Sequence, residues 1–310
     1  MRGCAHEARA GCRTTLGVER ARASYLDACE LDVAVRKPGN VSRASAGHGM
    51  QAALFSASAR ASVGPMFRPG ARVGDRIEAA VAATWDVAGC NTNLGIVLLC
   101  APIARAIELH PQADAPVRLR AAIEAVLADL DVDDARAAYR AIAQARPGGL
   151  GSAPAEDVRG APSIDLRAAM ALAAERDSIA RQYRDGYGDL FEFDLPPLVA
   201  ALSGMTREEG GALAAGVTDA AQRTYLWFLS RRPDSHIVRK HGAALAHSVM
   251  RSAQPWRARA LAGEHLDADP DFVAWDLELK SAGVNPGTSA DFTVAALFIA
   301  GLVAPSLVLR

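Results

Sequence analysis

Apolar residues recur at a spacing of three and four positions along most of the chain. Leu119, Ile123, Val126, Leu127 and Leu130 form one such series, and this spacing places side chains on one face of an α-helix. Alanine and leucine, which favour helices, are abundant, whereas the alternating β-branched runs typical of strands are scarce. The pattern therefore predicts an all-α protein, folded as a single large globular bundle of many helices.

Breaks in this pattern separate the predicted helices. We expect helices over residues 17–36, 50–63, 74–90, 94–109, 116–129, 132–145, 163–184, 187–202, 206–231, 235–252, 256–281 and 288–303. Pro38-Gly39 and Pro286-Gly287 lie in two of the breaks, because proline disfavours helical geometry in the residue before it and glycine permits a left-handed turn. The longest segment rich in helix-breaking residues covers 147–162; it is either a linker between two lobes or a loop over the mouth of a site.

Composition indicates a globular protein without a polyanionic partner. The 310 residues include 34 Lys and Arg against 35 Asp and Glu, a net charge of -1, so a nucleic-acid coat and a polybasic membrane patch are not expected. The five cysteines form no C-x-x-C pair, which favours a reducing, cytoplasmic location. Basic residues near the N-terminus are not followed by an apolar run, so no secretory signal is expected.

The expected organisation is a disordered tail over residues 1–15 and one all-helical catalytic domain over 16–310. An Ala- and Leu-rich helical surface is compatible with a homodimer. The uncharged stretch from Phe292 to Leu309 approaches the length of a membrane span, but it contains Gly301, Pro305 and Ser306 and has no basic residues on its N-terminal side. It is therefore predicted to be a buried core helix.

Two polar segments in the first third of the chain differ from ordinary helix sequence. Residues 36–43 (RKPGNVSR) and 47–50 (GHGM) lie between two predicted helices; they form either an anion-binding loop at a helix N-terminus or a solvated connection. Residues 86–95 (DVAGCNTNLG) precede an apolar helix. One of their Asn or Thr side chains can cap that helix, and the others are suited to the wall of a polar pocket.

Two further polar segments occur near the C-terminus. Residues 234–242 (DSHIVRKHG) hold two cations and two histidines; they form either a phosphate-binding cluster or a solvated helix face. His236 and His241 are five residues apart, which does not suit a zinc site. Residues 285–291 (NPGTSAD) precede the last apolar helix, where they act as a cap or bind a magnesium phosphate group.

These four segments resemble the triphosphoribosyl-dephospho-CoA synthase family. The matching stretches are KPGN with GHGM, then GCNTNLGIVLL, SHIVRKHG and NPGTSADF, in the family's order. The resemblance implies an all-helical enzyme that transfers the triphosphoribosyl group of ATP to 3′-dephospho-CoA and releases adenine. Its product is the precursor of the prosthetic group of an acyl carrier protein. ATP and 3′-dephospho-CoA are thus the expected partners, and Mg²⁺ the expected cofactor.

The chemistry implied by this resemblance suggests roles for individual residues. Displacement at the anomeric carbon passes through an oxocarbenium-like state and requires a general base, while a triphosphate requires cations and Mg²⁺. His48 is assigned to proton transfer, and Asp177 and Asp291 to catalysis and to the metal. The expected nucleotide-binding residues are Lys37, Asn40, Arg43, Asn91, Thr92, Asn93, Gly95, Arg239, Lys240, His241, Asn285, Gly287, Thr288 and Ser289.

One motif departs from the citrate-lyase branch of that family. The branch carries NTHKG where this chain has Asn91-Thr92-Asn93-Leu94-Gly95, so the sequence looks more like the malonate-decarboxylase branch or relatives in C1-cofactor pathways. Two alternatives therefore stand beside the leading hypothesis. One is a related transferase acting on a pterin-type intermediate, and the other is a nucleotide-binding protein without catalytic activity. All three require the polar segments to converge on one cavity.

Overall fold

The chain folds into a single all-helical domain in a computed structural model that describes residues 3–203 and 215–304. Within those ranges there is no β-strand, and only two isolated bridges occur, both in the loop after the first helix. The helices are α1 (Gly3–Ala34), α2 (Ala52–Met66), α3 (Val73–Ala88), α4 (Leu94–Leu109), α5 (Pro116–Ala128), α6 (Val132–Ala145), α7 (Leu166–Ala173), α8 (Ser178–Arg184), α9 (Gly188–Glu192), α10 (Leu195–Ser203), α11 (Ala215–Arg231), α12 (Ser235–His241), α13 (Ala243–Leu261), α14 (Pro270–Ser281) and α15 (Gly287–Val303), with a 3₁₀ turn at Leu266–Ala268. The predicted fold class is confirmed.

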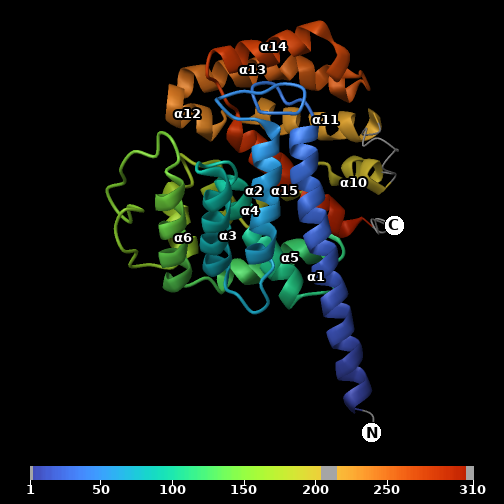
Figure 1. The fold of residues 1–310 in the computed structure, drawn as a ribbon, viewed down its shortest axis with the longest axis vertical. Helices are drawn as coiled ribbons and strands as arrows, with labels where there is room; N and C mark the ends of the chain where they lie inside the picture. Colours follow the sequence, from blue (N-terminus) through green and yellow to red (C-terminus); the bar gives the residue numbers. More distant parts are fainter. Residues whose placement is uncertain (1–2, 204–214, 305–310) are drawn as a thin grey trace.

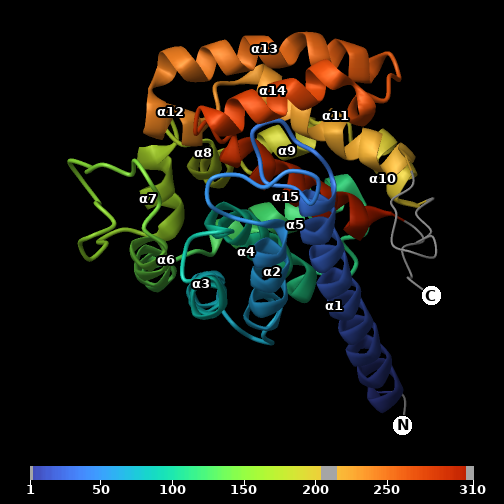
Figure 2. The same cartoon turned by 45° about the horizontal axis from the view of Figure 1, so that its top comes forward.

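The helices form a bundle covered at one end by a separate layer. Helices α1, α2, α3 and α6 run in roughly the same direction, while α11, α13 and α14 cross above them (Figure 1). Helix α15 passes between the two groups and packs against α1, α4 and α11 (Figure 2). The loop between α1 and α2 reaches the layer of α13 and α14. Connections from distant parts of the chain therefore meet at this end of the bundle.

Helix α15 is the centre of the apolar core. Its residues from Thr288 to Leu302 are buried with the exception of Asp291, so the predicted core helix is confirmed for the described part of the stretch; residues 305–309 lie outside it. Helix α4 is also buried on almost every side. None of the helices in residues 3–203 and 215–304 is long and apolar enough to cross a membrane.

Several helix boundaries follow directly from capping residues. Asp131 accepts hydrogen bonds from the backbone N–H groups of Asp133 and Asp134 and forms a capping box at α6, which explains why the predicted range 132–145 is observed. The predicted helix 163–184 is instead broken into α7 and α8, because Asp177 caps a new helix. Gly242 (φ +88°) separates α12 from α13, a break that the alanine-rich pattern around it concealed.

Other boundaries differ from the sequence-based ranges. The predicted helix 187–202 is divided into α9 and α10, and the predicted gap at 253–255 lies inside α13, which contains Pro255. Helix α1 begins at Gly3, upstream of the predicted start and within the residues expected to form a tail. The predicted helix 206–231 is described only from Ala215, because residues 204–214 lie outside the described ranges.

Candidate functional site

Two of the polar loops contact each other directly. Asn40 donates from Nδ2 to Oδ1 of Asn285 over 3.0 Å. A Cβ atom at Gly39 would lie only 2.7 Å from Cδ of Pro286, and Gly39 also has φ +82°. Glycine is required there both by the backbone conformation and by the close approach. The KPGN and NPG turns, far apart in sequence, are thus fitted together.

Helices α11 and α14 hold the first of these loops in place. Tyr225 donates from its hydroxyl to the carbonyl of Pro38 over 2.7 Å. Asp276, which is fully buried, accepts from the Gly39 N–H over 2.9 Å and is ion-paired with Arg36 and Lys280. Lys280 also donates to the carbonyl and hydroxyl of Ser45. The loop therefore has a defined conformation rather than that of a solvated connection.

One cavity of about 410 Å³ is lined by residues from all four polar segments. Asn40, Asn93 and Asp291 are all on its wall, so the predicted convergence is confirmed. The predicted site residues that line it are Asn40, His48, Asn91, Thr92, Asn93, Gly95, Asp177, Arg239, Lys240, Asn285, Gly287 and Asp291. Segment 147–162, which the sequence left open as a linker or a loop, supplies part of the same wall.

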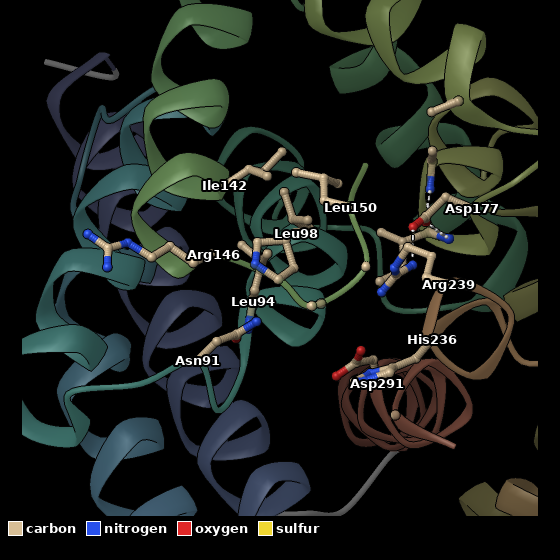
Figure 3. A pocket seen from close by; sticks show the side chains of 18 of the residues that line it. Asn91, Leu94, Leu98, Ile142, Arg146, Leu150, Asp177, His236, Arg239 and Asp291 are labelled. Atoms are coloured by element: carbon tan, nitrogen blue, oxygen red, sulfur yellow. Dashed lines mark hydrogen bonds and ion pairs between the residues drawn. The ribbon is translucent and has the colours of Figure 1, made fainter. Parts of the chain in front are cut away.

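The two sides of the cavity differ in chemistry. Leu94, Leu98, Ile142 and Leu150 lie on one side, and a charged group formed by Asp177, His236, Arg239 and Asp291 lies across from them (Figure 3). Such a combination suits a ligand with an apolar ring and charged groups, because ligand sites are mostly apolar with a few placed polar groups.

Two glycines make room for the side chains on the charged side. A Cβ atom at Gly95, in the first turn of α4, would lie 2.0 Å from Oδ2 of Asp291. A Cβ atom at Gly287, in the first turn of α15, would lie 2.6 Å from Nδ1 of His236. Any larger residue would displace these groups. Gly95 and Gly287, predicted as ligand contacts, thus also position Asp291 and His236.

Asp291 is a carboxyl group with no hydrogen bond or ion pair recorded among the described residues. Burial raises its pKa well above the ordinary value, and the nearby carboxylates Asp32, Asp234 and Asp177 raise it further, against an opposing effect of Arg239. Burial also raises the pKa of Asp32, although its ion pair with Lys37 acts in the opposite direction. Several carboxyl groups therefore lie close together beside the cavity, and their burial and mutual repulsion disfavour the ionised form of Asp291.

His236 is held as a neutral imidazole. Burial lowers its pKa to about 3, and the positive charges of Arg239 and Lys240 contribute, with smaller effects from His48 and His241. Its Nε2 is buried without a hydrogen-bond partner in the described part of the chain, as is Nε of Arg239. Because buried polar atoms are normally paired, these two cavity-lining residues have unused capacity for a ligand.

Asp177 and Arg239 form an ion pair on the cavity wall. Nη1 of Arg239 lies 2.6 Å from Oδ2 of Asp177. The other carboxylate oxygen of Asp177 accepts from the backbone N–H groups of Ile179 and Ala180 as the N-cap of α8. Both oxygens are therefore in use, which makes Asp177 better suited to orienting Arg239 than to binding a metal.

The three polar residues at the start of α4 have separate tasks. Oδ1 of Asn91, two residues before the N-cap residue Asn93, accepts from the Leu94 N–H over 3.1 Å and so holds the turn that leads into α4. Thr92 donates to the hydroxyl of Ser58 over 2.7 Å. Asn93 is buried on the cavity wall and makes no capping bond with its side chain. Asn93 is therefore the amide of this segment with most capacity for a ligand.

Five predicted binding residues do not line the cavity. Lys37 is fully buried and is ion-paired with Asp32, while the exposed Arg43 pairs with Glu30. The imidazole of His241 is hydrogen-bonded to the Gly283 carbonyl on the exposed side of α12. These residues belong to the polar segments that meet at the cavity, but residue type and spacing do not show which way each side chain points.

Thr288 and Ser289, the other two, join α12 to α15. Ser289 donates from its N–H and hydroxyl to Oδ2 of Asp234, the N-cap of α12. The hydroxyl of Thr288 lies 2.9 Å from that of Ser235 and accepts from the His236 N–H. These contacts fix the position of His236, so the two residues support the site without lining it.

Sequence reasoning missed several lining residues. Asp32 lies within α1 and Arg146 is the C-cap residue of α6; nothing in their local pattern distinguishes them from ordinary helix sequence. One sequence feature could have indicated that the segment after α6 contributes to the site: three of residues 148–151 are glycine. Gly149 has φ +74°, and a Cβ there would lie 2.4 Å from the Arg239 carbonyl, so these glycines let this loop pack on α12.

The donor set fits a Mg²⁺ ion that arrives with a nucleotide rather than a metal held by protein alone. Among residues 3–203 and 215–304, no three His, Cys, Asp or Glu side chains are grouped as a metal site. Nucleotide-bound Mg²⁺ needs only one or two carboxylates, because phosphates and water complete its shell. Asp291, unpaired and surrounded by other carboxylates, matches that requirement.

Comparison with known proteins agrees with this geometry. The model of the family described as CitG, ATP:dephospho-CoA triphosphoribosyl transferase, matches residues 18–307. A crystal structure from Archaeoglobus fulgidus, provisionally described as a triphosphoribosyl-dephospho-CoA synthase, superposes with a TM-score of 0.58 at 22% identity, over 80% of this chain and 98% of that chain. At this identity the likeness shows a shared fold. No curated protein matches the sequence.

Proposed function

The chain belongs to the ATP:dephospho-CoA triphosphoribosyl transferase family, and from this premise we propose that it transfers the triphosphoribosyl group of ATP to the 2′-hydroxyl of 3′-dephospho-CoA. Adenine is released, and the product is the precursor of an acyl-carrier-protein prosthetic group. The observation that supports this most is the joint lining of one cavity by four polar segments, with an apolar side opposite a charged side.

In this proposal the bond between C1′ of the ribose and the adenine nitrogen breaks, and its electron pair leaves with adenine. The acceptor 2′-oxygen forms the new bond to C1′ and loses its proton to a base, while adenine takes up a proton. Positive charge develops on the sugar in between, as in glycoside chemistry. Asn91, Thr92 and Asn93 contact the adenosine part of ATP, and Arg239 and Lys240 contact its phosphates.

His48 is suited to accept the acceptor proton. Its Nε2 lies 2.8 Å from the Gly39 carbonyl; since a carbonyl only accepts, Nε2 carries the hydrogen and Nδ1 of the neutral ring keeps its lone pair. Asp291, when ionised, can offset positive charge at the sugar. A bound Mg²⁺ would neutralise phosphate charge, with Asp291 as its protein ligand.

Release of free adenine is the direct test of this function. The purified chain with ATP, Mg²⁺ and dephospho-CoA should produce adenine, detected by chromatography, and Asp291→Asn should reduce the rate by at least about a hundredfold. Asp271→Asn, an exposed residue of α14, is the matched control and should leave the rate unchanged. Absence of adenine, under conditions where a known family enzyme is active, would contradict the proposal.

A second candidate acceptor follows from the NTNLG segment. Asn93 and Leu94 stand where the citrate-lyase branch carries other residues, and both line the cavity, so the acceptor could be a pterin-type intermediate instead. A panel of acceptors scored by adenine release separates the two: turnover with dephospho-CoA alone excludes the pterin alternative. Binding of an ATP analogue without turnover of any acceptor would favour a catalytically silent protein.

A further inference from the structure

The outer part of the cavity is apolar and partly open to solvent. We define it by Ile142 on α6, Leu150 in the loop after α6, and Met170 and Leu172 on α7, all of which line the cavity. Ile142 and Met170 are buried, but Leu150 is 41% and Leu172 is 54% exposed. Large apolar side chains beside a polar cavity, left accessible to water, indicate a surface that a ligand covers.

Exposed cations lie beside these leucines, although the guanidinium of Arg146 lies over the ring of Trp85, 5.9 Å from its centroid. Arg146, Arg176 and Lys240 line the cavity and are exposed, and no ion pair is recorded for any of them in the part of the chain that the structure describes. The two acidic residues of the same loop have partners of their own: Glu156 binds Ser163 and Asp157 binds Arg159. The outer part therefore combines apolar surface with exposed cations, of which Arg176 has no ion pair among the described residues.

The loop that carries Leu150 is fixed at two points. Tyr139 on α6 donates from its hydroxyl to the Glu156 carbonyl over 2.8 Å. At the other end Gly149 packs against the backbone of Arg239 so closely that no Cβ atom would fit. Leu150 is thus held beside the cavity by contacts with α6 and α12, and the apolar surface is a built part of the site.

We propose that this outer part binds the pantetheine arm of dephospho-CoA between Leu150 and Leu172, with the adjoining diphosphate near Arg176. This inference rests on the proposed function and adds to it the place of the acceptor. Dephospho-CoA joins a diphosphate to a long, weakly polar arm, which is the combination of charge and apolar surface found here.

The acceptor suits the outer part better than ATP does. The reacting groups of both substrates must meet beside Asp291 and Asn93, on the inner wall. The adenine of ATP is compact, can lie wholly against that wall, and leaves as a free base after the reaction. The acceptor arm, in contrast, extends away from its reacting ribose and needs an apolar path that leads to solvent.

Calorimetric titration of the full chain can test this placement without turnover. Leu172→Ser should weaken the binding of dephospho-CoA about tenfold, because much of the contact between the arm and Leu172 is lost. Binding of a non-hydrolysable ATP analogue with Mg²⁺ should stay within about twofold of the parent. Leu261→Ser, on the exposed side of α13 and 60% exposed, is the matched control and should alter neither affinity.

The possible results separate this inference from the proposed function. Unchanged dephospho-CoA binding in Leu172→Ser, no binding to the parent, or a selective loss of ATP-analogue binding would each overturn the placement. A tenfold loss for dephospho-CoA alone supports it. Adenine release is measured on the parent independently; its absence together with the selective binding effect would reject the reaction while keeping the acceptor site.

Discussion

On the charged side of the cavity, two glycines leave the space that the side chains of Asp291 and His236 occupy. Gly95 and Gly287 occupy the first turns of α4 and α15, where added Cβ atoms would collide with Asp291 and His236. The two titratable groups are consequently pressed into a low-dielectric wall, where burial disfavours their charged forms. The pKa of Asp291 rises well above its ordinary value and that of His236 falls to about 3, so the imidazole is neutral at neutral pH.

The lowered pKa of His236 has a consequence for stability. The unfolded chain takes up a proton on this ring below about pH 6.5, whereas the folded chain does so only near pH 3. Stability is therefore fully present above pH 6.5 and is lost as the pH falls through that window, by at most about 1.4 kcal/mol per unit.

Urea unfolding of the parent and of His236→Gln should reveal this effect. Between pH 7 and pH 4.5 the parent should lose roughly 2 kcal/mol more than the variant, after allowance for the partial exposure of the ring. Comparing the two proteins removes the opposite contributions of the buried carboxyls, which both share. Equal losses in parent and variant would mean that His236 titrates normally in the folded protein.

The predicted residues that line the cavity are mostly those whose type is unusual for their segment. Asn40, Asn93 and Asp291 stand in or beside turns next to apolar helices, where an extra polar group has no structural need. Lys37 has the same appearance, yet it is buried against Asp32, only five positions earlier. Residue type and spacing could not distinguish a cation facing a ligand from one facing its own helix.

At the scale of elements, the position of the first polar loop depends on α14. The buried carboxylate of Asp276 forms ion pairs with Arg36 and Lys280 and accepts a hydrogen bond from the Gly39 N–H. These contacts join the loop after α1 to a helix more than two hundred residues away in sequence. The contact between Gly39 and Pro286 then sets the distance between that loop and the start of α15.

Loss of this carboxylate should be costly. Asp276→Ala removes the buried carboxylate shared by Arg36 and Lys280, which leaves Arg36 only its longer ion pair with Asp267 and Lys280 only its bonds to Ser45. We therefore expect the free energy of unfolding to fall by about 3–5 kcal/mol. Asp271→Ala, on the exposed side of the same helix, should reduce it by less than about 1 kcal/mol. Urea denaturation measures both. Similar small effects for the two variants would show that Asp276 does not hold the loop.

Element boundaries were predictable where a cap is encoded locally. Asp131 and Asp134 define the start of α6, and the polar turn in which Asn91 accepts from the Leu94 N–H precedes α4, so the ranges of both helices follow from the sequence. The break between α7 and α8 was missed, because Asp177 lies within a series that continues at helical period on both sides. Its cap becomes recognisable only when the partner Arg239, on α12, is known.

At the scale of the molecule, two apolar clusters support the cavity from different sides. The larger one joins α1 to α10 with α15, and the smaller one lies beneath α11, α13 and α14. Polar loops meet where these units join, and both units supply lining residues, such as Asn93 and Arg239. The helical period of the apolar residues predicted the all-α class. The polar character of the four loops led us to expect that they meet at one cavity. The sequence could not predict which helices pack together, because similar Ala- and Leu-rich faces fit one another in many ways.

A crystal structure of the chain with ATP and Mg²⁺, in the absence of acceptor, tests the central claim most directly. We predict that the nucleotide lies in this cavity, with its adenosine part against Asn91 and Asn93 and its phosphates directed toward Arg239 and Lys240. A nucleotide bound elsewhere on the molecule, in contact with neither Asn93 nor Asp291, would contradict the account.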